Sequence, residues 1–493
     1  MDKPSMKTPN LADENFAALM ALFPCVVTET IGENGKVVRA IDKDVLAQEI
    51  NAHVVDGCEE RYQFTWPDKR KSVLLANAPI VAALRPCREE SVDFDTTENL
   101  YIEGDNLDVL KLLRETYLYH VKLVYIDPPY NTGKDFVYED DFVEDAGEFL
   151  RRDGQYDEQG NRMTENLDSN GRFHTDWLNM MYPRLRIARD MLTDDGVIFI
   201  SIDDSEVENL KKICSEIFGD NNFVAEIAYQ GMDTVKNDTK YFSDNHEYIL
   251  CFAKNKDLLL IKGQRRTEGH NKVYKNYDND PRGDYLLTPL HAKSGNANNQ
   301  FEYSFSNGVK FSPPQGTYHR FSRNSLKEME ANGQIYFGAG VPQKKTYLSD
   351  VSNYVKLTTF WDYKLAGSTR QSNKEVAELL GKGMFDNPKS LKLLRLIIDS
   401  VTDKNDLILD FFPGSATTAH AVMQLNAEDG GNRKFIMVQL PEVCAEDSEA
   451  VKAGYKNICE IGKERILRAG TQGGDKRRKS VDDRKSRHRF PCA

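Results

Sequence analysis

A short strand that ends in two prolines constrains the fold of this chain more than any other stretch. Residues 123–131 read LVYIDPPYN, so an apolar, β-prone run is followed directly by Asp127, Pro128, Pro129 and Tyr130. Proline has no N–H to donate to a sheet ladder, so the strand must end there. The residue before each proline is also held extended. The sequence therefore predicts a stiff elbow at the carboxyl end of a strand, the edge at which open α/β sheets bind ligands.

The elbow carries groups that suit an exocyclic amine on a planar heteroaromatic ring. The Asp127 carboxylate can accept one N–H, the Pro128 carbonyl can accept the other, and the Tyr130 ring can stack on the base. Holding both hydrogens turns the nitrogen lone pair towards an electrophile. A proline-rich turn with a packed tyrosine is the alternative without a function. However, Asp-Pro-Pro-Tyr arises by chance in a chain of this length with a probability of roughly a few in a thousand.

This elbow resembles the signature of the amino-methylating DNA methyltransferases, Asp/Asn/Ser-Pro-Pro-Tyr/Phe. The Asp form, followed by Asn131, Thr132 and Gly133, resembles the adenine-N6 branch. The resemblance implies that a flipped adenine is methylated from S-adenosyl-L-methionine. It assigns catalysis to Asp127, Pro128, Pro129 and Tyr130. Two alternatives stay open: methylation of cytosine N4, whose amine is chemically alike, and a catalytically weak DNA-binding specificity subunit.

Composition restricts the location of the protein and the kinds of partner it can bind. No apolar run approaches the roughly 18 residues needed to span a bilayer, so no membrane partner is expected. The N-terminus also lacks the apolar segment of a signal peptide. The eight cysteines are scattered without a C-x-x-C pair, which favours a cytoplasmic location and no metal site. The net charge of −12 argues against a uniformly basic nucleic-acid binder, but it leaves room for a local basic surface.

A second strand–loop–helix pattern lies in the C-terminal part of the chain. The run Leu407–Leu409 ends at Asp410, a turn FPGSA follows, and a helix is expected from about Ala416. That order is the nucleoside-binding geometry of doubly wound folds. It resembles the family's Phe-x-Gly-x-Gly motif, with Ala416 in place of the second glycine, which puts cofactor affinity in doubt. The resemblance assigns the cofactor to Asp105, Asp127, Lys389, Asp410, Phe412, Gly414, Ser415 and Gln439.

Between these two patterns, residues 255–375 change in character. They carry 18 Lys and Arg against 11 Asp and Glu, a local excess of seven positive charges in an acidic chain. Basic side chains interleaved with aromatic ones suit phosphate contact and base stacking. A solvated insertion is the plainer interpretation. Just before this segment, Tyr248 could equally wall the base pocket or be a buried strand tyrosine. The candidate DNA contacts are Tyr248, Arg265, Arg266, Lys344 and Lys345.

The order of elbow, basic insertion and cofactor loop resembles the β class of amino-methyltransferases, and in particular the modification subunit of type III restriction–modification systems. The resemblance implies an α/β, Rossmann-like methyltransferase fold with permuted motif order and an inserted target-recognition domain. It also implies double-stranded DNA as substrate, a homodimer, and a helicase–nuclease restriction subunit as partner. The expected domains are an N-terminal extension (1–95), a catalytic half (96–254), the target-recognition domain (255–375), a cofactor-binding half (376–470) and a basic tail (471–493) expected to be disordered. Relatives often continue further, which suggests a truncated or frameshifted end.

Overall fold

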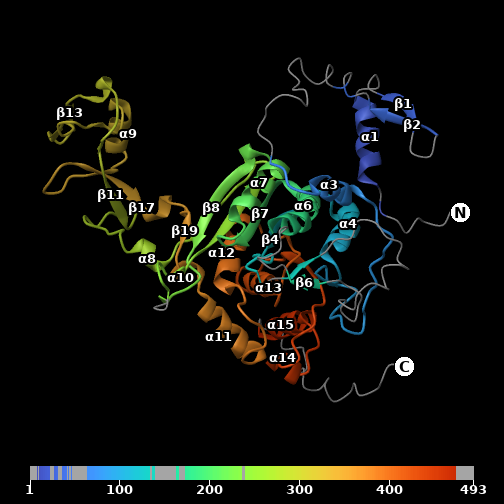
Figure 1. Ribbon diagram of the computed structural model, residues 1–493. Helices are drawn as coiled ribbons and strands as arrows, with labels where there is room; N and C mark the ends of the chain where they lie inside the picture. Colours follow the sequence, from blue (N-terminus) through green and yellow to red (C-terminus); the bar gives the residue numbers. More distant parts are fainter. Residues whose placement is uncertain are drawn as a thin grey trace. The chain divides into compact units, whose positions relative to one another are not determined.

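The computed structural model describes residues 8, 10–22, 27–31, 36–41, 43, 46, 64–133, 136–138, 163–165, 173–235 and 239–472. It divides into two compact units (Figure 1). One unit is the continuous segment Lys262–Leu357, and the other is built from the chain on both sides of that segment. The polar, acidic segment 136–170 has no sustained hydrophobic period, which predicts a loop over the active site. Most of this loop and nearly all of the expected tail lie outside the described residues. The described parts of that loop, β5 (Phe136–Tyr138) and β6 (Met163–Glu165), form an antiparallel pair.

An eight-stranded mixed sheet is the framework of the larger unit. Only β9 runs antiparallel to its neighbours, β7 and β8. Strand β4, which leads into the proline elbow, and strand β20, which leads into the turn after Asp410, lie side by side although 280 residues of chain separate them. The order across the sheet is β19 (Phe360–Trp361), β8 (Phe223–Tyr229), β9 (Glu247–Ala253), β7 (Leu192–Ile202), β4 (Val121–Ile126), β20 (Leu407–Asp410), β21 (Lys434–Gln439) and β3 (Leu100–Glu103).

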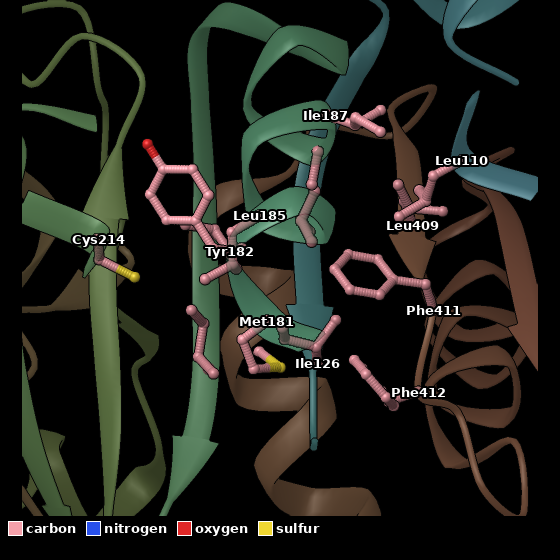
Figure 2. Close-up of a cluster of buried hydrophobic side chains, with 14 of the residues drawn as sticks. Leu110, Ile126, Met181, Tyr182, Leu185, Ile187, Cys214, Leu409, Phe411 and Phe412 are labelled. Atoms are coloured by element: carbon pink, nitrogen blue, oxygen red, sulfur yellow. The ribbon is translucent and has the colours of Figure 1, made fainter. Parts of the chain in front are cut away.

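The central strands are apolar on both faces because helices cover both faces. Every residue of β4 is buried, and so are residues 196–202 of β7. On one face, α4 (Asn106–Tyr117), α6 (Phe173–Met191) and α7 (Val207–Phe218) pack on the sheet in one large apolar cluster. Figure 2 shows part of this cluster, in which Met181 of α6 lies close to Ile126, and Leu185 and Phe411 belong to the same cluster.

The handedness of the strand–helix–strand connections indicates which face of the sheet α13 covers. The connection β3–α4–β4 crosses the sheet in one direction, and β20–α13–β21 crosses it in the other. Right-handed crossovers therefore put α13 (Thr417–Asp429) on the face opposite α4. The other helices of this unit are α1 (Leu11–Leu22), α3 (Lys69–Asn77), α10 (Tyr363–Ala366), α11 (Thr369–Leu380), α12 (Leu391–Val401), α14 (Glu449–Lys452) and α15 (Ile458–Gln472), and β1 (Val27–Ile31) pairs with β2 (Val37–Ile41).

The smaller unit is made of short antiparallel pieces around its own apolar cluster. Leu290, Phe305, Phe311, Leu326 and Ile335 are buried in that cluster. Its central strand β17 (Gln343–Tyr347) pairs with β11 (Tyr285–Pro289) on one side and with β16 (Ile335–Tyr336) on the other. The other elements are the pairs β10 (Gln264–Arg265) with β18 (Tyr354–Val355), β12 (His291–Ala292) with β15 (Tyr318–His319) and β13 (Tyr303–Ser304) with β14 (Lys310–Phe311), and the helices α8 (Glu268–Asn271) and α9 (Arg323–Ala331). Among the helices that the structure describes, none has the length and apolarity needed to cross a membrane.

Candidate active site and cofactor loop

Hydrogen bonds to residues in and beside the helices on one face of the sheet hold the elbow after β4 in place. The Trp177 indole of α6 donates a hydrogen bond to the Pro129 carbonyl at 2.7 Å. Asn131 turns the chain with a left-handed backbone (φ 62°), a conformation that asparagine tolerates better than most residues. Its buried side chain donates to the Glu206 carboxylate at 2.6 Å and to the Phe173 carbonyl at 3.2 Å. These bonds hold the elbow rigidly at the sheet edge.

Two acceptors at the elbow have no hydrogen-bond donor among the residues that the structure describes. One is the Pro128 carbonyl, since the Trp177 indole goes to the next carbonyl along. The other is Asp127 Oδ1, which is buried. Lys389 Nζ lies 3.3 Å from Oδ1, but the contact is an ion pair without hydrogen-bond geometry. Burial raises the pKa of Asp127, although the Lys389 charge opposes that rise. The two acceptors that the sequence assigned to an amine are therefore both open.

Behind these acceptors lies a charged cluster that joins three distant parts of the chain. Lys389 Nζ donates to Glu247 Oε2 at 2.6 Å and to the Tyr130 hydroxyl at 2.5 Å, and that hydroxyl donates to the same Glu247 oxygen. Burial raises the pKa of Tyr130 well above its usual value, so the phenol stays protonated. Burial alone would lower the pKa of Lys389, but the Asp127 and Glu247 carboxylates outweigh it and raise that pKa. Lys389 was assigned to the cofactor, and here it contacts the elbow.

Strand β9 contributes Glu247 to the elbow, next to Tyr248, which the sequence analysis assigned to the base pocket. Successive residues of a strand point to opposite faces of the sheet, and in β9 it is Glu247 that reaches the elbow. Tyr248 is partly buried against the large apolar cluster, and its hydroxyl lies 3.2 Å from His246 Nε2. The contact of β9 with the elbow is therefore made by Glu247, and the assignment of Tyr248 to the base pocket stays a prediction. Strand alternation showed that only one of the two residues could face the elbow, but not which one.

The loop after β20 has the backbone that a glycine-rich cofactor loop requires. Gly414 has φ +50°, and a Cβ at that position would lie 3.0 Å from Phe385 Cζ. Ala416 also has a left-handed backbone, with φ 61°, at the position where the family motif has glycine. Asp410 closes the loop by accepting from the Phe412 N–H at 3.0 Å and from Thr418 Oγ1 at 2.5 Å. Burial raises the pKa of Asp410 to about 7.

Two further side chains assigned to the cofactor are also bonded within the protein. Gln439 Oε1 accepts from the Gly414 N–H at 2.9 Å. The Ser415 hydroxyl accepts from Arg465 at 2.8 Å, and the Thr417 hydroxyl accepts from the same guanidinium at 2.7 Å. Arg465 was missed because it lies in α15, and no local motif marks it. It is buried, and burial lowers its pKa to about 10. These side chains shape the loop, and their contact with a cofactor stays a prediction.

The start of α4 is joined to the same edge of the sheet. Asp105 Oδ1 caps the helix by accepting from the Asp108 N–H at 3.0 Å, and its Oδ2 lies 3.2 Å from the Arg184 guanidinium. The Gly104 N–H donates to the Gln439 carbonyl at 3.0 Å. The side chain of the next residue, Asn106, donates to the Phe411 carbonyl at the same distance. The predicted cofactor residues at 105, 412–415 and 439 therefore meet at one edge, beside β4.

In the smaller unit, the basic residues assigned to DNA differ in exposure. Lys345 is only 5% exposed, and its ammonium lies 2.5 Å from Asp278 and 2.8 Å from Asp280. A buried, paired ammonium cannot meet a phosphate at the surface, so this assignment is corrected. Arg265 is exposed, Arg266 is half-buried with its Nε donating to the Ser352 carbonyl at 2.9 Å, and Lys344 is half-buried 5.3 Å from the Phe321 ring.

Solved methyltransferase structures resemble the chain at low similarity. The M1.HpyAVI–SAM complex is 15% identical, with 74% of this chain and 98% of that chain covered and a TM-score of 0.32. PvuII DNA methyltransferase (cytosine-N4-specific) is 14% identical, with 76% and 94% covered and a TM-score of 0.34. Identities and TM-scores as low as these do not assign the chain to a family.

Sequence relatives and a family model give that assignment. The model of the N6/N4 methyltransferases, described as DNA methylase, matches residues 121–452. The StyLTI Mod subunit of Salmonella typhimurium is 36% identical over 86% of this chain and 65% of its own length. The EcoPI Mod subunit of Escherichia phage P1 is 33% identical over 92% and 74%, and the EcoP15I Mod subunit of Escherichia coli is 30% identical over 94% and 76%. The chain thus spans about two thirds to three quarters of these relatives. It belongs to the N6/N4 DNA methylase family, in the group that contains the modification subunits of type III restriction–modification enzymes.

Proposed function

We propose that this chain transfers a methyl group from S-adenosyl-L-methionine to N6 of an adenine flipped out of duplex DNA. The observation that carries the proposal is the pair of open acceptors at the elbow. Asp127 Oδ1 is buried without a hydrogen bond, and the Pro128 carbonyl beside it has no donor among the described residues. A buried acceptor left unpaired costs about 1–3 kcal/mol. An amine that donates to both acceptors would remove that cost at the moment of reaction.

The residues around the cofactor loop fit a nucleoside cofactor. The two left-handed backbone positions, Gly414 and Ala416, let the chain pass close to a ligand, and the loop leads into the N-terminus of α13. The side chain of Asp105 is 27% exposed at the same edge and retains acceptor capacity for a base or ribose group. When bound, S-adenosyl-L-methionine would supply an electrophilic methyl on a sulfonium, a leaving group that needs no metal.

The chain's own residues would then orient the target. A base inside the duplex is out of reach, so it must be flipped, with Tyr130 stacking on its face. Asp127 and the Pro128 carbonyl each accept one N–H of the amine and direct its lone pair towards the methyl. The Asp127 bond strengthens as the nitrogen becomes tetrahedral and gains positive charge, so it favours the transition state over the bound base. The remaining contribution is positioning by the rigid elbow.

DNA recognition and assembly extend the same proposal. The compact unit Lys262–Leu357 lies within the basic segment 255–375, and its exposed cations and aromatic residues suit contact with a nucleic-acid backbone. We assign target recognition to this unit and propose the domain limits given above. The relatives' names as Mod subunits of type III restriction–modification enzymes support assembly with a further subunit. That this subunit is a helicase–nuclease, and that the chain forms a homodimer, we propose from the family resemblance alone.

The test is methylation-aware sequencing of DNA from cells that express the chain, combined with digestion of that DNA to nucleosides. N6-methyladenine at one sequence motif, absent with the Asp127→Ala variant, is the expected result. N4-methylcytosine would move the chain to the cytosine branch of the family, which the same acceptor pair could serve. DNA without either modification, from a chain that binds its recognition site, would favour the specificity-subunit alternative.

A further inference from the structure

Glu247 is a buried acidic residue that no motif of the sequence singled out, and it touches both Tyr130 and Lys389. We propose that Glu247 is a positioning residue: it holds the Lys389 ammonium away from Asp127, so that Asp127 Oδ1 stays open for the target amine. The inference rests on the proposed function, because it concerns how the same elbow is kept ready for the base.

The distances show an uneven sharing of one cation between two carboxylates. Lys389 Nζ lies 2.6 Å from Glu247 Oε2 but 3.3 Å from Asp127 Oδ1. The Lys389 ammonium therefore donates hydrogen bonds to Glu247 and to the Tyr130 hydroxyl. Asp127 Oδ1 is attracted by the positive charge of the ammonium but accepts no hydrogen bond from it. A charged hydrogen bond in a dry site is strong. Without Glu247, the ammonium would take the nearest open acceptor, which is Asp127.

The neighbours of Glu247 fix its position. Apart from Asp127, no other carboxylate among the described residues pairs with Lys389. A Cβ at Gly231 would lie 2.9 Å from Glu247 Oε1, so the small residue at 231 makes room for the carboxylate. The Tyr229 hydroxyl, which also faces this cluster, donates to the Gly367 carbonyl at 2.9 Å. The side chains of Lys389 and Glu247 are 15% and 17% exposed, so water competes weakly for the ammonium. Among the described residues, only Asp127 and Glu247 offer ion-pair oxygens to Lys389.

The consequence is a competition that a substitution can reveal. The amine of the target base and the Lys389 ammonium are both N–H donors, and both suit Asp127 Oδ1. Glu247 decides the outcome by binding the ammonium more closely. Glu247→Gln keeps the size of the side chain but removes its charge, so the ammonium should move to Asp127 and block the amine. Removing Lys389 as well should abolish the dependence on Glu247.

The first arm of the test measures single-turnover methyl transfer on DNA that contains the recognition site. We expect E247Q to lower the rate at least tenfold, with the dissociation constant of S-adenosyl-L-methionine unchanged by calorimetry. In the K389M background, E247Q should change the rate by less than twofold. Glu226→Gln is the matched control, because Glu226 pairs with Lys211 at the surface of the neighbouring strand, and it should behave as wild type. An equal loss from E247Q in both backgrounds, or a loss below twofold in the wild type, overturns the proposal.

The second arm does not depend on activity. Crystal structures of the wild type and of E247Q should show Lys389 Nζ moving from residue 247 to a hydrogen bond with Asp127 Oδ1. An ammonium that stays on the amide of the E247Q variant overturns the proposal even if the rate falls. A wild-type chain that methylates no DNA would refute the proposed function instead, and the two structures would still decide whether Glu247 holds the lysine.

Discussion

Asp127→Ala tests the role of the elbow most directly. The change removes a carboxylate whose Oδ1 is buried without a hydrogen bond, and it leaves the closer partner of Lys389, Glu247, in place. A hydrogen bond to a charged group contributes about 1.5–3 kcal/mol. If the Asp127 bond forms fully only as N6 becomes tetrahedral, its loss lowers the methyl-transfer rate by about 10- to 150-fold. Loss of lone-pair orientation adds to that figure, so we expect activity to fall near background.

The same variant should remain folded and bind both ligands. The unpaired buried acceptor disfavours the folded state, so removing it offsets part of the lost attraction to Lys389. The assay is single-turnover transfer of a labelled methyl group, run beside calorimetric titration of S-adenosyl-L-methionine and a DNA-binding titration. A rate within about tenfold of the wild type, a change of about 1.4 kcal/mol, would refute the assignment of Asp127. A comparable loss of cofactor binding would show that the carboxylate acts on the cofactor instead.

Further substitutions test other parts of the site. Tyr130→Phe should keep more activity than Tyr130→Ala, since the ring supplies a stacking contribution of about 1–3 kcal/mol; equal rates for the two variants would mean that the hydroxyl carries the effect. Gly414→Asp should sharply raise the dissociation constant of S-adenosyl-L-methionine, because a Cβ there meets Phe385 at 3.0 Å and the backbone is left-handed. An unchanged constant would reduce the loop to a connector. Three cations of the smaller unit are to be changed together to glutamine: Arg265, Arg266 and Lys344. This triple variant should flatten the slope of log DNA affinity against log salt concentration, by about one unit for each phosphate contact that is lost. Lys345→Gln should instead lower the stability of the fold, because it breaks a buried ion pair. An unchanged slope would exclude the three cations as phosphate ligands.

Local patterns in the sequence predicted the two strand ends that build the site. Prolines stop β4 directly after Leu123–Ile126, and a turn stops β20 at Asp410, so both boundaries follow from neighbouring residues. That the two strands lie side by side could not be predicted in this way, because nothing local joins residue 124 to residue 409.

The contacts between distant side chains could not be predicted in this way. Glu247 and Lys389 meet only because β9 and the start of α12 reach one elbow, 142 residues apart in sequence. Lys345 looked like a surface cation, yet it is buried because pairing of β11 with β17 brings its strand against Asp278 and Asp280. Such pairings depend on which face of a strand is covered, and periodicity alone cannot say which.

Ala416 gives a last test of how closely the cofactor loop follows its family. The left-handed backbone at φ 61° costs an alanine about 1–2 kcal/mol, and glycine would remove that cost. Against this, glycine loses about 0.4–1 kcal/mol through the freer unfolded chain, and it gives up a fully buried methyl worth about 0.8 kcal/mol.

These contributions to the free energy of unfolding nearly cancel, so Ala416→Gly should leave the melting temperature almost unchanged. Because the methyl is 0% exposed, it is covered by protein and does not project into an open cofactor site. The dissociation constant of S-adenosyl-L-methionine should therefore stay within about twofold of the wild type, a difference of about 0.4 kcal/mol in binding free energy. A constant about tenfold tighter in the variant would show that the methyl obstructs the cofactor, and that the departure from the glycine motif weakens binding after all.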